Sequence, residues 1–361
     1  MTANNIKKIP RGWKITLMLV SIPAFLFVSE LILTLIPINT RFENRFFLVN
    51  RALDYLEVFK KDKNLFWRFR PSQTVSSRFF ENKTYHINSL GLRGDEIDLQ
   101  TDKIRIAALG NSCTFGWGID DSGIYINQLK KLIDSDSDLP QVEVINAGIP
   151  GYSSWQGRRL FQSDILPLKP RVVLIMFAWN DQWAAADNIP DCEQKMPPQF
   201  IIDLQNLFSR LKIYRLIKKL ALSAVEQPLR TKLIKENPVY RVSETDLNNN
   251  LTAIIQACRI KGLTPILLTS PIPSLTGYYP PGSRSLMHTY HECYIRQTRL
   301  VASSTETFMV DLAAEFDKYD DLFDDAAYDP IHFNARGHRV AAETIYGFIK
   351  KNPQILNRGV N

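Results

Sequence analysis

Five short apolar runs constrain the fold of this 361-residue chain more than any other feature of its sequence. Runs rich in Val, Ile and Leu are typical of strands that are buried on both faces of a parallel sheet. Stretches with helical periodicity follow them, so the pattern predicts a doubly wound α/β sheet. The runs are Ile104–Leu109, Val142–Ala147, Val172–Ala178, Pro265–Thr269 and Phe308–Leu312, and the candidate helices lie near 122–135, 155–164, 244–261, 286–303 and 336–350.

An apolar segment near the N-terminus, residues 15–38, is long enough to cross a membrane, because about 20 apolar residues span the hydrocarbon core as a helix. Its one charged residue is Glu30. The run is longer than a usual signal-peptide core and no small-x-small cleavage site follows it, which favours a retained anchor over a cleaved signal. Residues 1–14 carry four basic residues and no acidic one, which predicts a cytoplasmic tail and a body in the periplasm or outside the cell.

The remaining chain, residues 39–361, carries 40 basic and 36 acidic residues without a dense basic stripe. This balance does not indicate a nucleic-acid-binding protein. The four cysteines form no C-x-x-C pair, which excludes a zinc ribbon or a thioredoxin motif and leaves free thiols and a disulfide open. His288, His291 and Cys293 have a spacing that suits a metal, but no fourth ligand is evident, so we expect no metal and no other cofactor.

The chain beyond the anchor divides into a lead-in and a large domain. The lead-in, residues 39–103, is rich in aromatic residues and is expected to contain short strands at Val75–Phe80 and Thr84–Ile87. The α/β domain is expected to cover residues 104–352. Within it, residues 183–243 break the alternation of strand and helix, and we interpret them as an insertion that could cover a site.

Small or polar residues follow the apolar runs, and the edge at which such strands end is where doubly wound sheets bind ligands. Taken singly, each of these groups is more often a helix cap or a turn. The four groups are Gly110–Asn111–Ser112, a glycine loop that ends in Gly151, Asn180 within Ala178–Asp181, and Asp329–Pro330–Ile331–His332.

Taken together, these groups supply every part that nucleophilic catalysis needs. A serine such as Ser112 is a poor nucleophile without a base, and histidine is the usual base. The spacing of Asp329 and His332 allows the carboxylate to orient the imidazole, which leaves the other ring nitrogen for Ser112. The N–H groups of Ser112 and Gly151, with the Asn180 side chain, can donate to a developing oxyanion.

These blocks resemble the SGNH (GDSL-like) hydrolase superfamily across roughly residues 104–350. The stretch Asn88–Arg93 also resembles bacterial members that carry an N-terminal membrane anchor. The resemblance implies a flavodoxin-like sheet of five parallel strands and ester hydrolysis without a metal. It implies Ser112 as nucleophile, His332 as base and Asp329 as its partner, with an oxyanion hole of Ser112, Gly151 and Asn180.

Two residues depart from the family pattern. Asn111 stands where the family usually has Asp, which keeps the shape of the side chain and removes its charge. Ala178 stands where a glycine is usual, which adds a methyl group near the oxyanion loop.

Four tryptophans lie within a few residues of these blocks and, with Asn111, form the candidate substrate pocket. Aromatic walls suit both sugars and acyl chains, and packing beneath the loops is an equal alternative. The tryptophans are Trp117, Trp155, Trp179 and Trp183, and Tyr278 and Tyr279 could add to the rim.

An anchored domain that faces outward predicts an ester substrate in the cell envelope. Our first hypothesis is the hydrolysis of small O-acyl groups on an extracytoplasmic glycan or another envelope component. The alternatives are a lysophospholipase-like lipid esterase, an O-acyltransferase, and a catalytically inactive glycan-binding or assembly protein on the same fold.

Overall fold

The computed structural model describes residues 10–35, 58–76, 83–185, 188–218, 220–221, 239–273, 283–324 and 329–356. The first nine residues of the expected basic tail, Tyr278 and Tyr279, and the middle of the expected insertion lie outside these ranges. So do residues 77–80, the second half of one expected lead-in strand.

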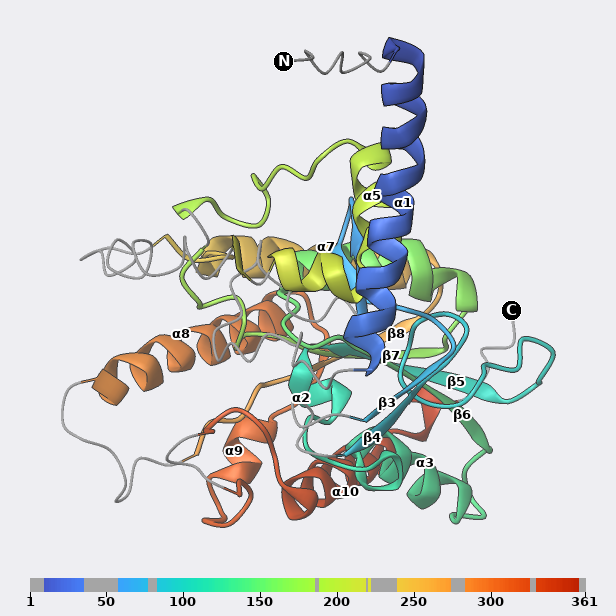
Figure 1. Ribbon diagram of the computed structural model, residues 1–361. Coiled ribbons are helices and arrows are strands. Elements are labelled where there is room, and N and C mark those ends of the chain that lie inside the picture. Colours follow the sequence, from blue (N-terminus) through green and yellow to red (C-terminus); the bar gives the residue numbers. More distant parts are fainter. Residues whose placement is uncertain are drawn as a thin grey trace, which may run out of the picture.

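The centre of the molecule is a parallel sheet of five strands in the order β6-β5-β7-β8-β9 (Figure 1). The chain starts beside one edge, adds one neighbour on that side, and then winds to the other side, which is the flavodoxin-like order. The predicted doubly wound α/β fold is therefore confirmed. The strands are β5 (Ile104–Gly110), β6 (Val142–Gly148), β7 (Val172–Met176), β8 (Thr264–Leu268) and β9 (Phe308–Val310).

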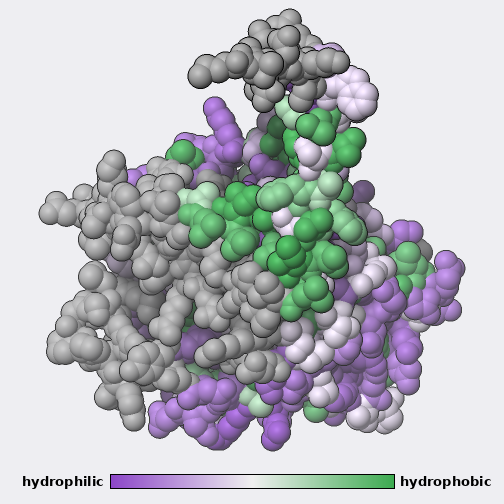
Figure 2. Space-filling view, viewed as in Figure 1, coloured by the Kyte–Doolittle hydropathy of each residue, from purple (hydrophilic) through white to green (hydrophobic). Residues whose placement is uncertain are grey.

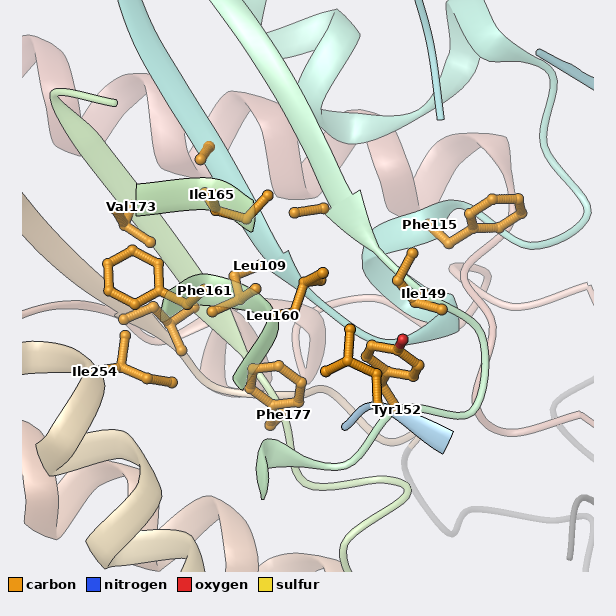
Figure 3. Packing of buried hydrophobic residues seen from close by; sticks show 14 of the residues in the cluster. Leu109, Phe115, Ile149, Tyr152, Leu160, Phe161, Ile165, Val173, Phe177 and Ile254 are labelled. Atoms are coloured by element: carbon orange, nitrogen blue, oxygen red, sulfur yellow. The ribbon is translucent and has the colours of Figure 1, made fainter. Parts of the chain in front are cut away.

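Helices cover both faces of the sheet. Alternate residues of a strand point to opposite sides, so a continuous apolar run gives each face an apolar surface for helices to pack on. Ala107 and Leu109 of β5 belong to the apolar cluster on one face, part of which Figure 3 shows. Ile106 and Ala108 belong to the cluster on the other face. The first cluster includes residues of α4 (Ser154–Leu160), α7 (Glu244–Ile260) and α8 (Ser283–Ser304), and the second includes residues of α3 (Tyr125–Asp134) and α10 (Ala335–Lys351).

Two of the apolar runs extend beyond their strands. The run at 308–312 leaves the sheet after Val310, because the Asp311 side chain accepts the N–H of Ala314 and starts α9 (Leu312–Phe316). The run at 172–178 leaves it after Met176. The described elements also include short helical turns: η3 (Asp121–Gly123), η4 (Phe161–Ile165), η5 (Leu166–Leu168) and η7 (Pro353–Ile355).

Two antiparallel hairpins precede the sheet. β3 (Gln73–Ser76) pairs with β4 (Thr84–Ile87), close to the expected lead-in strands. The hairpin of β1 (Phe59–Asp62) and β2 (Phe66–Phe69) was not predicted. Its Trp67 donates the indole N–H to the carbonyl of Pro150 at 3.2 Å, and the Tyr152 hydroxyl donates to the carbonyl of Trp67. The hairpin therefore supports the loop that follows β6.

Arg93, the last residue of the quoted lead-in motif, is fully buried beneath the short helix α2 (Ser112–Phe115). Its Nη1 donates to the carbonyls of Phe115 and Gly116, both at 2.7 Å, and its Nη2 donates to that of Ile119 at 2.6 Å. Its Nε pairs with Asp121 at 2.8 Å. The last carbonyls of a helix lack partners inside it, so this guanidinium completes the C-terminal end of α2.

The N-terminal helix α1 (Arg11–Leu35) extends away from the sheet (Figure 1). Residues Gly12–Leu35 are long and apolar enough to cross a membrane, which fits a membrane anchor or a signal sequence. Most side chains of α1 are exposed. The less exposed ones follow helical spacing in its C-terminal half: Leu26, Ser29, Glu30 and Leu33.

We expect Arg93→Met to lower the free energy of unfolding by about 3 kcal/mol or more, because three backbone carbonyls and one carboxylate lose a buried, charged donor. Urea unfolding of the full chain in detergent measures the effect. The matched control is Arg339→Met, at an exposed position of α10, which should change stability by no more than about 0.5 kcal/mol. Equal stability of the two variants would show that Arg93 does not hold this region.

Candidate active site

Ser112 is the first residue of α2, and only Asn111 separates it from the end of β5. Asn111 caps the helix, because its side-chain oxygen accepts the N–H of Cys113 at 3.0 Å. A Cβ atom at Gly110 would lie 2.1 Å from Thr114 Oγ1, so this turn requires glycine. Ser112 is 8% exposed, and the turn presents it at the carboxyl edge of the sheet.

His332 joins Ser112 to Asp329 in one hydrogen-bonded chain. Its Nε2 lies 2.8 Å from Ser112 Oγ, and its Nδ1 lies 2.6 Å from Asp329 Oδ2. The other Asp329 oxygen accepts the backbone N–H groups of Ile331 and His332 at 3.1 and 3.2 Å. Burial raises the pKa of Asp329, but the hydrogen bonds and the charge of His332 outweigh it and hold that pKa below its ordinary value. The carboxylate is therefore ionised and fixed in place.

Trp117 packs against the imidazole of His332. The ring centroids are 5.6 Å apart and the planes are inclined by 21°. A flat apolar surface on one side of the histidine restricts rotation of its ring. Trp117 therefore helps to keep both ring nitrogens aimed at their partners.

Gly151 and Asn180 lie on the loops that follow β6 and β7, the two neighbours of β5. Gly110 pairs with Gly148 and with Met176, so both loops begin beside the Ser112 turn. Gly151 has a φ of +82°, a conformation that favours glycine. The Asn180 side-chain amide donates to the carbonyl of Tyr152 at 3.1 Å, which ties the two loops together.

Asp181 forms a second link behind these loops. Its side-chain oxygens accept the N–H of Ala178 at 3.2 Å and that of Ser154 at 2.9 Å. Ala178 has a φ of +134°, in the region that favours glycine, so the residue that departs from the family pattern holds a strained backbone. Burial raises the pKa of Asp181 to about 6, against the opposing effect of its hydrogen bonds with Ser154.

The two described ends of the expected insertion meet at a buried ion pair that the sequence did not reveal. Arg241 pairs with Asp191 at 2.9 Å, and both side chains are almost fully buried. Arg241 Nη1 donates to the Gly151 carbonyl at 2.7 Å, and Asp191 accepts the hydroxyl of Ser153 at 2.6 Å. The pair therefore fixes the loop that carries Gly151.

The candidate pocket residues lie at different depths. Trp117 contacts His332, whereas Trp155 stacks on Phe66 with 5.0 Å between ring centroids. Trp179 is fully buried, and Trp183 is half-buried. Asn111 is also fully buried and serves as the cap described above.

His291, one of the residues with metal-like spacing, is buried against Trp179, with 3.8 Å between ring centroids. Its Nε2 bonds to the carbonyl of Ser270 at 2.8 Å. Among the described residues, no three His, Cys, Asp or Glu side chains gather as a metal site would require. All four cysteines are free thiols, which settles the alternative that the sequence left open.

The family model of the GDSL-like Lipase/Acylhydrolase family matches residues 108–340. No curated protein matches the chain. Similar solved structures include LAE5, an alpha/beta hydrolase enzyme from the metagenome of Lake Arreo, Spain, at 19% identity, covering 72% of this chain and 99% of that one with a TM-score of 0.45. They also include Axe2, an acetylxylan esterase from Geobacillus stearothermophilus, at 18% identity, covering 73% and 99% with a TM-score of 0.44.

The raised pKa of Asp181 predicts a pH-dependent stability. The folded state binds this proton more tightly than the unfolded state, where the pKa is near 3.8. The resulting stabilisation is complete below pH 3.8 and is lost as the pH rises through about 6. Relative to Asp181→Asn, the free energy of unfolding of the unsubstituted protein should therefore fall by about 2 kcal/mol between about pH 4 and pH 7.

Urea unfolding at a series of pH values measures the free energy of unfolding of both proteins. The other titrating groups contribute equally to both, so their contributions cancel in the difference. Asp138→Asn, at an exposed position, is the matched control and should show no such trend. A constant difference between the protein and Asp181→Asn would mean that Asp181 titrates normally.

Proposed function

Because the chain belongs to the GDSL-like lipase/acylhydrolase family and is therefore an ester-hydrolysing enzyme, we propose that Ser112, His332 and Asp329 carry out the hydrolysis. The observation that supports this assignment best is the hydrogen-bonded chain from Ser112 Oγ through both nitrogens of His332 to Asp329. An inactive binding protein would have no need of a serine, a base and a carboxylate in this order.

In the proposed reaction, Ser112 Oγ attacks the ester carbonyl carbon, and its proton passes to His332 Nε2. Asp329 holds the Nδ1 proton and stabilises the imidazolium that forms. The tetrahedral intermediate collapses, and the leaving alcohol takes the proton from His332. Water then attacks the acyl-serine with His332 as the base, which releases the acid and restores Ser112.

The negative charge on the carbonyl oxygen needs donors that are already in place. We assign this role to the N–H groups of Ser112 and Gly151 and to the side-chain amide of Asn180. The amide nitrogen of Asn180 carries two hydrogens, of which one bonds to the carbonyl of Tyr152. The second hydrogen is the one that would meet the oxyanion.

Turnover of a short-chain aryl ester by the full chain in detergent tests these roles. Ser112→Ala and His332→Ala should lower kcat by a factor on the order of 10⁴ or more, and Asp329→Asn should cost a similar factor because the tautomer is lost. A fluorophosphonate should label Ser112, and this labelling should require His332. Ser303→Ala, at an exposed position of α8, is the control and should retain full activity. Normal turnover by Ser112→Ala would refute the assignment.

For the substrate, we propose small O-acyl groups on an extracytoplasmic glycan or another envelope component. Two features support this choice. The apolar helix α1 would hold the enzyme at a membrane, and the basic residues before it favour a cytoplasmic N-terminus with the body on the far side. An aromatic ring, Trp117, lies against the catalytic histidine, and its 9% exposed part would form the wall beside a bound sugar.

The substrate class is tested by comparing two esters with the same enzyme preparation. We expect acetate release from an O-acetylated polysaccharide, and no such release by Ser112→Ala. Fatty-acid release from a lysophospholipid, without acetate release from the polysaccharide, would overturn the glycan proposal in favour of a lipid esterase. The same preparation is first shown to hydrolyse the short-chain aryl ester, so failure on one substrate is distinguishable from an inactive preparation.

A further inference from the structure

The helix α5 (Gln199–Phe208) is apolar on two sides. Ile202 is fully buried, so this side packs on the body. On the other side, Phe200, Leu204 and Leu207 are 64%, 46% and 60% exposed. Their spacing of four and three residues places them on one face of the helix. An ordinary surface helix turns one apolar stripe inward and a polar face to water, so this second stripe is unpartnered.

Glu30, the one charge in the apolar part of α1, binds the segment that follows α5. Its two carboxylate oxygens accept the backbone N–H groups of Lys212 at 2.8 Å and of Ile213 at 3.1 Å. These N–H groups open a helical segment at residues 212–218, where a carboxylate is favoured by the helix dipole. Lys212 Nζ also reaches the carbonyl of Leu33 at 3.3 Å.

Glu30 lies 16 residues beyond Lys14, the last charged residue before the apolar part of α1, a distance of ~24 Å along a helix. The hydrocarbon core of a bilayer is about 30 Å thick, so in a membrane-spanning α1 this residue lies within about one helical turn of the boundary of the leaflet on the side of the body. The segment 212–218 and the end of α5, four residues before Lys212, then lie at the same boundary. Figure 2 shows the exposed apolar surface of α1 with further apolar surface beside it. Within the segment 212–218, Ile217 is 57% exposed.

Positive charge accompanies this apolar surface. Arg210, Lys212, Arg215 and Lys218 follow α5, and no acidic residue occurs between 204 and 221. The acid on α5 itself, Asp203, accepts a hydrogen bond from Gln199.

Two more basic residues approach from the first hairpin. Burial, and then the charge of Lys218, lower the pKa of Lys61 to about 8. Burial, and then Arg210 and Arg215, lower the pKa of Arg70. The basic residues of the hairpin region and of the segment after α5 therefore lie close to one another.

We propose that α5 and the helical segment 212–218 form a lipid-binding surface that lies on the membrane beside α1. The exposed apolar side chains would enter the boundary between headgroups and acyl chains, and the basic residues would bind the phosphates of anionic phospholipids. Amphipathic helices with basic residues bind membranes by this combination of apolar burial and charge attraction. The partner is a lipid surface because this patch continues α1, the one helix in the described part of the chain that is suited to crossing a bilayer.

This surface is connected to the catalytic residues through direct contacts. Asn206 of α5 accepts the N–H of Lys61 at 2.8 Å and donates to its carbonyl at 2.9 Å. Lys61 lies on β1, whose hairpin partner β2 holds Tyr152 through Trp67. The loop that carries Gly151 would therefore be held at a fixed distance from the bilayer surface.

Spin labels on the full chain, held singly in nanodiscs, test the proposal. In a Cys192→Ser, Cys293→Ser background, one cysteine is placed at Leu204, at Val20 of α1, or at Glu343, an exposed position of α10. Accessibility to oxygen, which concentrates in lipid, is compared with accessibility to a water-soluble nickel chelate. We expect the ratio of oxygen to nickel accessibility at Leu204 to be several-fold above that at Glu343 and to approach that at Val20.

Phosphatidylglycerol in the nanodisc should raise the ratio at Leu204 above its value in pure phosphatidylcholine. The variant with Arg210→Gln and Lys218→Gln should lose this rise. If the ratio of oxygen to nickel accessibility at Leu204 equals that at Glu343, the proposal is overturned, whether or not the label at Val20 lies in lipid. A label shielded from both reagents would also overturn it, because a protein or a second copy of this chain would then cover the surface.

Discussion

The close seating of α2 on the ends of β5 and β6 is the constraint on which the rest of the site depends. A Cβ atom at Gly110 would lie 2.1 Å from Thr114 Oγ1, and one at Gly148 would lie 2.2 Å from the nitrogen of Phe115. The short helix therefore rests directly on strand backbone. This contact places Ser112 beside the loops after β6 and β7, so that groups far apart in the chain meet at one edge of the sheet.

Irregular loops at the edge of a sheet leave backbone carbonyls that no strand or helix satisfies. Two buried guanidinium groups bind such carbonyls here. Arg93 binds those at the end of α2, and Arg241 binds that of Gly151. A guanidinium suits this task because it presents five N–H donors in one rigid plane. The lead-in and the ends of the expected insertion therefore belong to the framework of the site.

The sequence was sufficient for the sheet because strands buried on both faces leave continuous apolar runs. β5, β6 and β8 lie within one residue of their expected bounds. The sequence also predicted which residues would gather at the carboxyl edge, since parallel strands all end there. It did not predict the hairpin of β1 and β2, because Phe66–Phe69 places three aromatic residues among four and does not alternate. Nor did it reveal Arg93 and Arg241, because a charged residue gives no sign in the sequence that it will be buried.

The hydrogen bonds between Glu30 and residues 212–213 join parts of the chain that are separated by 182 residues. The N-terminal helix is therefore synthesised long before its partner exists. By the time Lys212 leaves the ribosome, the chain of β5, β6 and β7 has already been made, while β8 and β9 have not. The contact of α1 with the body can thus form only after the first half of the sheet is available. The oldest part of the nascent chain therefore waits for a partner that lies more than halfway along the sequence.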